Sequence, residues 1–250
     1  MRILLARHGE TPWNAEGRYQ GQEDIPLSPI GEAQARSLGE RLRGVRIDRA
    51  VASPLARARR TAELALGEAR ASMLAFDDGL LEIAHGTWEG LLASEIRERD
   101  GERLRAWREA PDTVLMPGGE SLPQVLQRAW PAFERATSGL GADDTLLVVA
   151  HDAVNRVLLC HVLGIPLSRL WGFRQAPATL NLFEGADAGH LDVVRAQITG
   201  SIIGTSLLGL GLACLAGGWR REKQTFSRER AGLLSSLLVI VVLALLLPAV

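Results

Sequence analysis

The residues near the start of the chain that are best suited to chemistry are Arg7 and His8, which directly follow the apolar run of residues 3–6. A neutral imidazole nitrogen is a good nucleophile for phosphorus, and a guanidinium offers a planar pair of donors to phosphate oxygens. Gly9 and Glu10 follow, and the chain continues as TPWN. The segment therefore predicts a phosphate-handling histidine at the carboxyl end of a strand.

Two further apolar runs end in candidate residues of the same kind. Residues 49–52 are followed by SPLAR, which supplies Arg57, and residues 145–150 are followed by His151. Parallel strands end along one edge of an α/β sheet, and ligands bind at that edge. We therefore expect two histidines and two arginines to meet in one cleft. The free amides of a helix that begins at Asp152 would favour an anion beside them.

Short strands alternate with helical patterns along the first part of the chain. The strands, including one at residues 2–6, are apolar without alternation, as expected where helices cover both faces. This order predicts a three-layer α/β domain with a mostly parallel sheet flanked by helices. Residues 180–183 and 191–194 predict a hairpin that closes the domain near residue 196. The predicted helices cover residues 28–44, 55–66, 94–109, 121–138 and 152–163.

The composition changes after residue 196. Residues 198–218 and 231–250 contain no charged side chain, and each reaches the roughly 20 residues that a bilayer-spanning helix needs. The second stretch is the stronger candidate, because six glycines lower the helix propensity and apolar area of the first. We therefore predict a catalytic domain over residues 1–196 and a hydrophobic membrane tail over residues 197–250.

Charge favours one orientation of this tail. Residues 196–250 hold five basic and two acidic side chains, so residues 1–195 carry a net charge of about −4 and do not resemble a nucleic-acid binder. Basic segments tend to stay in the cytoplasm, so we expect one span over residues 231–250, with residues 198–218 lying at the interface or re-entering without crossing. A hairpin of two spans is the alternative. A strand directly after Met1 leaves no room for a secretory signal. We expect a membrane-anchored protein whose catalytic domain is cytoplasmic.

Five motifs, in a fixed order, resemble the histidine phosphatase superfamily, the phosphoglycerate mutase-like enzymes. They are RHGETPWN at residues 7–14, GRYQG at 17–21, SPLARARRTAE at 53–63, LEIAHGTWEG at 81–90 and VVAHDAVNR at 148–156. Together they extend the resemblance over residues 1 to about 195.

The resemblance implies a role for each site residue and a small phosphorylated substrate, with no metal and no cofactor. His8 becomes phosphorylated. Arg7, Arg57 and His151 hold the phosphoryl group, and Glu82 protonates the leaving oxygen. The positions that line the substrate site are Asn14, Gln20 and Gly21.

Two of these positions leave alternatives open. Asp77 and Asp78 are nearby acids that compete with Glu82, which is identified by the resemblance and not by its spacing. His85 could face the substrate, pack in the interior or face solvent. We expect Trp88 to be structural.

The reaction also has alternatives. HGTWEG and the modest stretch between Glu82 and His151 resemble the phosphatase branch, which includes α-ribazole phosphatases and broad-specificity phosphatases. A membrane tail favours α-ribazole phosphatase, because a late step of cobalamin assembly is catalysed by a membrane enzyme. Phosphoglycerate mutase-type transfer is the alternative, since the arginines at 97, 99, 103, 105 and 108 supply positive charge.

Two readings belong to other classes. Two histidines and a glutamate could bind zinc, but the adjacent arginines would repel a cation and no HExxH spacing is present. The two cysteines, Cys160 and Cys214, also lack metal-binding spacing. A non-catalytic, membrane-bound phosphate-binding protein is the other alternative. The sequence predicts no oligomeric state.

Overall fold

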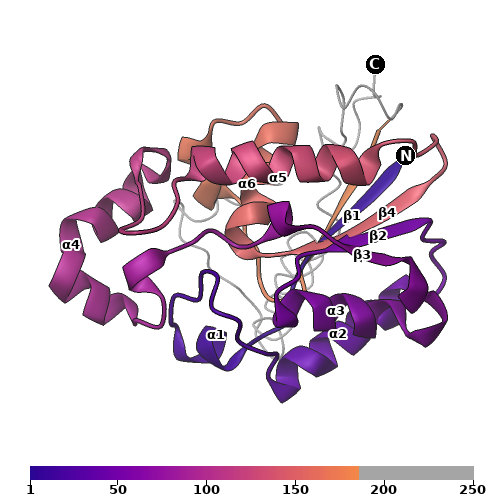
Figure 1. Cartoon of the computed structure of the whole chain (residues 1–250), viewed down its shortest axis with the longest axis horizontal. Helices are drawn as coiled ribbons and strands as arrows, with labels where there is room; N and C mark the ends of the chain where they lie inside the picture. Colours follow the sequence, from indigo (N-terminus) through magenta and orange to yellow (C-terminus); the bar gives the residue numbers. More distant parts are fainter. Residues whose placement is uncertain (186–250) are drawn as a thin grey trace, which may run out of the picture. The chain divides into compact units, whose positions relative to one another are not determined.

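A five-stranded sheet lies at the centre of residues 1–185, the part of the chain that this computed structural model describes (Figure 1). The strands lie in the order β3-β2-β4-β1-β5. The first four in the chain are parallel, and β5 runs antiparallel beside β1. Their bounds are Arg2–Arg7 for β1, Arg49–Ala52 for β2, Leu74–Phe76 for β3, Thr145–Ala150 for β4 and Leu180–Glu184 for β5.

The prediction of a mostly parallel α/β sheet is confirmed. Residues 180–184 form a strand as expected, but within the described part of the chain this strand pairs with β1. The predicted second strand of the hairpin, residues 191–194, lies outside the described residues.

Helices cover both faces of the sheet, which makes the three predicted layers. On one face, Leu4 and Leu147 belong to an apolar cluster with residues of α2 (Pro29–Leu42) and α3 (Ala56–Leu66). The opposite face packs against α5 (Leu122–Thr137) and α6 (Asp152–Val162). Figure 1 shows these two helix pairs on either side of the strands. Because neighbouring residues of a strand point to opposite faces, apolar strands without alternation serve both layers.

The five predicted helices are confirmed, and several shorter elements join them. Besides α2, α3, α5 and α6, the predicted helices include α4 (Ala93–Glu109). The short helix α1 (Pro12–Glu16) was not predicted. In Figure 1 both lie beyond the edge at which the parallel strands end. The 3₁₀ helices are η1 (Glu68–Met73), η2 (Asp78–Leu80), η3 (Gly86–Trp88), η4 (Pro111–Thr113) and η5 (Leu167–Gly172).

The start of α2 is joined to the turn that follows β1. Ser28 caps the helix, because its Oγ accepts a hydrogen bond of 3.0 Å from the amide of Gly31. The same hydroxyl donates to the carboxylate of Glu10 over 2.9 Å. Side-chain caps satisfy amides that the first helical turn leaves unpaired. This cap also holds the turn after His8 against α2.

The predicted membrane segments, residues 198–218 and 231–250, lie outside the described residues. Within residues 1–185, none of the helices is both long enough and apolar enough to cross a bilayer.

Candidate active site

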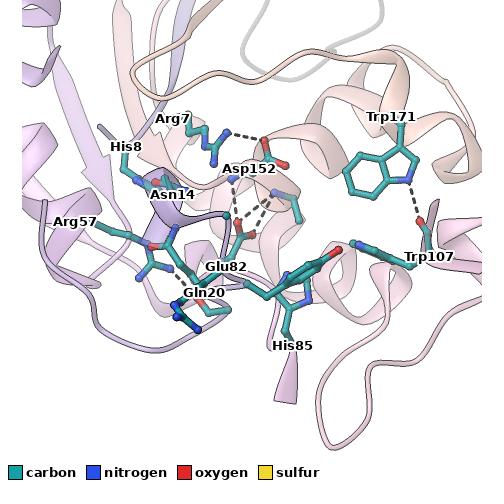
Figure 2. Close-up of a pocket in the computed structure, with 15 residues that line it drawn as sticks. Arg7, His8, Asn14, Gln20, Arg57, Glu82, His85, Trp107, Asp152 and Trp171 are labelled. Carbon is teal, nitrogen blue, oxygen red and sulfur yellow. Dashed lines mark hydrogen bonds and ion pairs between the residues drawn. The ribbon is translucent and has the colours of Figure 1, made fainter. Parts of the chain in front are cut away.

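A cavity of about 300 Å³ opens where the parallel strands end, and Figure 2 shows the side chains around it. Seven of the eight predicted site residues line it: Arg7, His8, Asn14, Gln20, Gly21, Arg57 and Glu82. The eighth, His151, is completely buried and is not among the lining residues. Its ring centroid lies 5.1 Å from that of His8. The strand ends therefore bring the candidates together, with His151 in contact with His8.

The imidazole of His8 is held in one orientation by the next residue. Its Nδ1 lies 2.6 Å from the carbonyl oxygen of Gly9, and a carbonyl only accepts, so Nδ1 carries the proton. The lone pair of Nε2 is then available. Burial lowers the pKa of His8 well below its ordinary value, and the charges of Arg57 and Arg7 lower it further. The ring is neutral at neutral pH.

Glycine is required beside this histidine. A Cβ at Gly9 would lie 2.4 Å from the carbonyl oxygen of Gly31 at the start of α2. The close approach of two backbones explains the glycine after His8.

Two guanidiniums, those of Arg7 and Arg57, supply positive charge beside His8 in the pocket. Arg57 is fully buried and donates to the carbonyls of Gly21 and Glu23, each over 2.7 Å. Burial lowers the pKa of Arg57 to about 10, which leaves it charged at neutral pH. Arg7 forms an ion pair of 3.1 Å with Asp152. Within the described part of the chain, the Nε atoms of both arginines are buried without a hydrogen-bond partner, which suits them to an anionic ligand.

The carboxylate of Glu82 lies at the N-terminus of α6. It accepts hydrogen bonds from the amides of Asp152 over 3.0 Å and Ala153 over 3.2 Å, and from the amide of Ile83 over 3.0 Å. The amides at the start of this helix were expected to favour an anion, and the anionic group that they bind in this structure is the Glu82 carboxylate. Burial raises the pKa of Glu82, and the charge of Asp152 adds to the rise.

The two competing acids are placed elsewhere. Asp77 forms an ion pair of 2.8 Å with Arg135 and accepts a hydrogen bond of 2.9 Å from the amide of Gly79. Neither Asp77 nor Asp78 lines the cavity. Of the three carboxylates, Glu82 is the one in a position to reach a ligand there.

His151 is bonded to the end of β2. Its Nε2 lies 2.7 Å from the hydroxyl oxygen of Ser53, which directly follows that strand. Its buried Nδ1 has no hydrogen-bond partner among residues 1–185. Burial lowers the pKa of His151 well below its ordinary value, and the charge of Arg57 lowers it further. This ring is neutral as well.

Aromatic side chains form another part of the cavity lining. His85 lies there, with its ring edge-on to that of Tyr19 at a centroid distance of 5.0 Å. His85 therefore packs against Tyr19 and also faces the cavity, so the structure combines the packing role with the substrate-facing position. Trp88 is buried, and its indole nitrogen donates to Asp100 over 3.2 Å, as expected for a structural residue.

Sequence reasoning missed five other lining residues that carry functional groups: Arg18, Tyr19, Trp107, Asp152 and Trp171. Arg18, Tyr19 and Asp152 stand inside quoted motifs, so their positions gave a usable signal. No local pattern marked the two tryptophans. Within residues 1–185, no group of three histidine, cysteine or acidic side chains is arranged to hold a metal ion.

Comparison with protein families identifies the class. The model of the histidine phosphatase superfamily, branch 1, matches residues 3–198, so the chain belongs to this superfamily, as the motifs predicted. A second model, that of the sodium/calcium exchanger protein family, matches residues 178–250.

Individual relatives include both phosphatases and a mutase. Phosphoserine phosphatase 1 of Hydrogenobacter thermophilus is 38% identical over 173 residues, which cover 69% of this chain and 81% of the relative. A protein described as a probable phosphoglycerate mutase of Salmonella choleraesuis is 34% identical, with 66% and 76% covered. The crystal structure of an α-ribazole phosphatase from Shigella flexneri is 29% identical, with a TM-score of 0.66 and 74% and 90% covered. The chain is thus an enzyme of the histidine phosphatase superfamily, with phosphatase or mutase activity.

Proposed function

We propose that the chain hydrolyses phosphate monoesters through a phosphohistidine intermediate on His8. The observation that carries this proposal is the hydrogen bond between His8 Nδ1 and the Gly9 carbonyl, which leaves Nε2 as the free nucleophile in the cavity. Arg7 and Arg57 lie beside it with unpaired Nε donors among the described residues. A neutral nucleophile between two guanidiniums suits a phosphoryl group, whose charge spreads over several oxygens during transfer.

The first half of the reaction forms the intermediate. His8 Nε2 attacks phosphorus, and the bond between phosphorus and the ester oxygen breaks. Glu82, in its carboxylic acid form, gives its proton to the leaving oxygen, so the product is a neutral alcohol. Arg7 and Arg57 bind the phosphoryl oxygens. His151 donates Nδ1–H to the same group, provided that its Nε2 accepts from the Ser53 hydroxyl.

The second half restores the enzyme. Water attacks phosphorus, the bond to His8 Nε2 breaks, and inorganic phosphate leaves. Glu82, now a carboxylate, takes the proton of the attacking water and is ready for another cycle. Asn14, Gln20 and Gly21 line the same cavity and would contact the substrate.

The substrate that we propose is α-ribazole phosphate. The likeness to a solved α-ribazole phosphatase supports this choice, as does an apolar tail that would place the enzyme near membrane-made substrates. Phosphoglycerate mutase-type transfer is the second candidate, favoured by the Salmonella relative. In that case the alcohol product stays bound and takes the phosphoryl group back at another oxygen.

We also propose that residues 231–250 anchor the protein in a membrane, with the catalytic domain in the cytoplasm and residues 198–218 at the interface. Two uncharged stretches of sufficient length support this proposal. The match of residues 178–250 to an ion-exchanger family adds support, since an exchanger acts across a membrane. A reporter fused after Val250 that is active only in the cytoplasm would contradict the single span. Full-length protein in the soluble fraction would contradict the anchor.

A substrate panel tests the reaction. Full-length protein is given α-ribazole phosphate, 3-phosphoglycerate, O-phosphoserine and p-nitrophenyl phosphate, and both inorganic phosphate and the organic product are measured. We expect phosphate release, fastest with α-ribazole phosphate, and no release by His8→Ala. His161→Ala, an exposed histidine on α6, is the matched control. Isomerisation of phosphoglycerate without phosphate release would favour the mutase, and turnover by His8→Ala would contradict the mechanism.

A further inference from the structure

An aromatic wall lines the cavity on the side away from the nucleophile. It consists of Tyr19, His85, Trp107 and Trp171. Figure 2 shows Trp107 and Trp171 across the cavity from His8, with Glu82 between them. The four rings come from four separate segments: the chain after α1, the residue before η3, the end of α4, and η5.

The outermost ring of the aromatic wall is fixed in position although it is exposed. Trp171 is 39% exposed, yet its indole nitrogen donates to the carbonyl of Trp107 over 2.9 Å. The two indoles meet edge-on with centroids 5.2 Å apart. The guanidinium of Arg156 lies 5.1 Å from the Trp171 ring and is itself paired with Asp152 over 3.0 Å. An exposed indole that is already ordered loses little entropy when a ligand binds to it.

The aromatic wall carries no charge at neutral pH. Burial lowers the pKa of His85 to about 4, so this imidazole is neutral, and burial raises the pKa of Tyr19, so its hydroxyl stays protonated. An uncharged surface of ring faces and edges suits a flat, apolar group.

The cavity offers little to a second anionic group of a substrate. Among the described residues, its lining cations are Arg7 and Arg57 at the phosphoryl end, and Arg18. Arg18 already pairs with Glu16 over 2.5 Å and donates to the Gly90 carbonyl over 2.7 Å. A carboxylate next to the phosphate ester would therefore meet aromatic rings rather than a free cation.

We propose that the aromatic wall binds an aromatic ring in the alcohol part of the substrate, so that the enzyme selects phosphate monoesters of ring-bearing alcohols such as nucleosides. Trp171 determines this specificity by stacking against the ring, and the buried Trp107 holds Trp171 in place, while the phosphoryl group lies at His8. This inference rests on the proposed hydrolysis at His8 and adds the residues that would recognise the ring of the leaving alcohol, whichever ring-bearing alcohol it is.

A matched pair of substrates tests the aromatic wall. Adenosine 5′-monophosphate and ribose 5-phosphate present a 5′-phosphate on the same sugar, with and without a ring system. We expect a higher kcat/KM for the nucleotide than for ribose 5-phosphate. Trp171→Ala should lower kcat/KM for the nucleotide by about tenfold, as stacking contributes elsewhere, and leave ribose 5-phosphate nearly unchanged. Trp171→Phe should keep most of the preference.

Phe76→Ala is the control, because Phe76 is also an exposed aromatic residue, 46% accessible, but does not line the cavity. The Phe76→Ala variant should leave kcat/KM unchanged for both substrates. Equal wild-type kcat/KM for the two substrates, a preference for 3-phosphoglycerate, or an equal loss on both in Trp171→Ala would overturn the inference. Failure of the proposed function looks different: no substrate is hydrolysed, or His8→Ala remains active.

Discussion

The guanidinium of Arg128 donates a hydrogen bond of 2.9 Å to the main-chain carbonyl of Glu82. It also donates to the carbonyl of Leu81 over 2.6 Å and pairs with the carboxylate of Glu120 over 2.7 Å. Glu120 in turn accepts a hydrogen bond of 2.9 Å from the amide of Ala84. Arg128 and Glu120 therefore hold both sides of the segment that carries the proposed acid.

Replacing the acid should affect esters according to their leaving groups. Glu82→Gln is expected to slow hydrolysis of alkyl phosphates by about 10²- to 10⁴-fold, because an alkoxide leaves poorly without a proton. Aryl phosphates with acidic phenols need no such proton, so their kcat/KM, which reports the transfer of the phosphoryl group to His8, should change little. The ratio of kcat/KM for the two ester types measures this. Equal slowing of both would remove Glu82 from the role of acid.

Loosening the support of Glu82 should give a weaker form of the same pattern. Arg128→Ala is expected to lower alkyl phosphate hydrolysis more than aryl phosphate hydrolysis, since the acid segment loses its hydrogen bonds while His8 is untouched. Arg128→Lys, which keeps the charge beside Glu120, should recover part of the loss. Arg135→Ala is the control on the same helix, because Arg135 is exposed and pairs with Asp77 outside the cavity.

If Arg128→Ala lowered kcat/KM equally for alkyl and aryl phosphates, this prediction would be contradicted. That result would show that the residue supports the fold in general and does not position Glu82. Thermal unfolding of each variant shows whether the protein is folded when the rates are measured.

The pH dependence should follow the two proposed catalytic groups. His8 must be neutral to attack, and burial keeps its pKa well below the ordinary value, so the nucleophile stays active into mildly acidic solution. Glu82 must be protonated to act as an acid, so alkyl phosphate hydrolysis should fall as the pH rises through its pKa. Burial raises that pKa, the charge of Asp152 raises it further, and the facing Arg57 and Arg7 lower it.

Asp152→Asn changes one of these charges. Removing the carboxylate lowers the pKa of Glu82, so the alkaline limb of kcat/KM for alkyl phosphates should move to lower pH. The aryl phosphate profile, which needs no proton from Glu82, should keep its alkaline limb. A shift toward higher pH, or the same shift for both esters, would contradict the assignment.

Gly21 should tolerate no side chain. Its φ is +55°, and a Cβ there would lie 1.9 Å from Oε1 of Glu89. That carboxylate also accepts from the amide of His85 over 2.9 Å, while the Gly21 carbonyl accepts from Arg57. Gly21→Ala should therefore cost about 1–3 kcal/mol of stability and raise KM by displacing Arg57.

Denaturant unfolding and steady-state kinetics check the effect of this glycine substitution. The control is Gly44→Ala, because nothing lies within 4 Å of a Cβ at Gly44. It should be nearly neutral in both measurements. Wild-type stability and KM in Gly21→Ala would show that the backbone there adapts without cost.

Local sequence pattern is sufficient to predict that the residues around His8 lie together. Arg7 is the last residue of β1, and His8 and His151 directly follow β1 and β4. Both strands are short and mostly apolar and buried, so the placement of these residues at one edge follows from parallel pairing alone. The fold class follows from the same alternation. β3 (Leu74–Phe76) was not predicted, because it has three residues whose side chains are half-buried or exposed.

The rest of the site depends on tertiary packing that no local pattern marks. Trp107 and Trp171 are separated by 64 residues and meet only because α4 and η5 lie together. Arg128 stands on α5 like any polar residue of an amphipathic helix, and its contacts are mostly to main-chain carbonyls. The binding of Glu82 to the α6 amides likewise joins segments 70 residues apart.

The phosphoryl group on the enzyme itself tests the central claim most directly. Full-length protein is mixed briefly with radioactive phosphate monoester, quenched in alkali, digested and mapped by mass spectrometry. The account predicts one labelled peptide that carries the phosphoryl group on His8, stable in alkali and lost in acid, and absent from His8→Ala. Label on another residue, or turnover without any label on His8 at quench times shorter than one catalytic cycle, would contradict it.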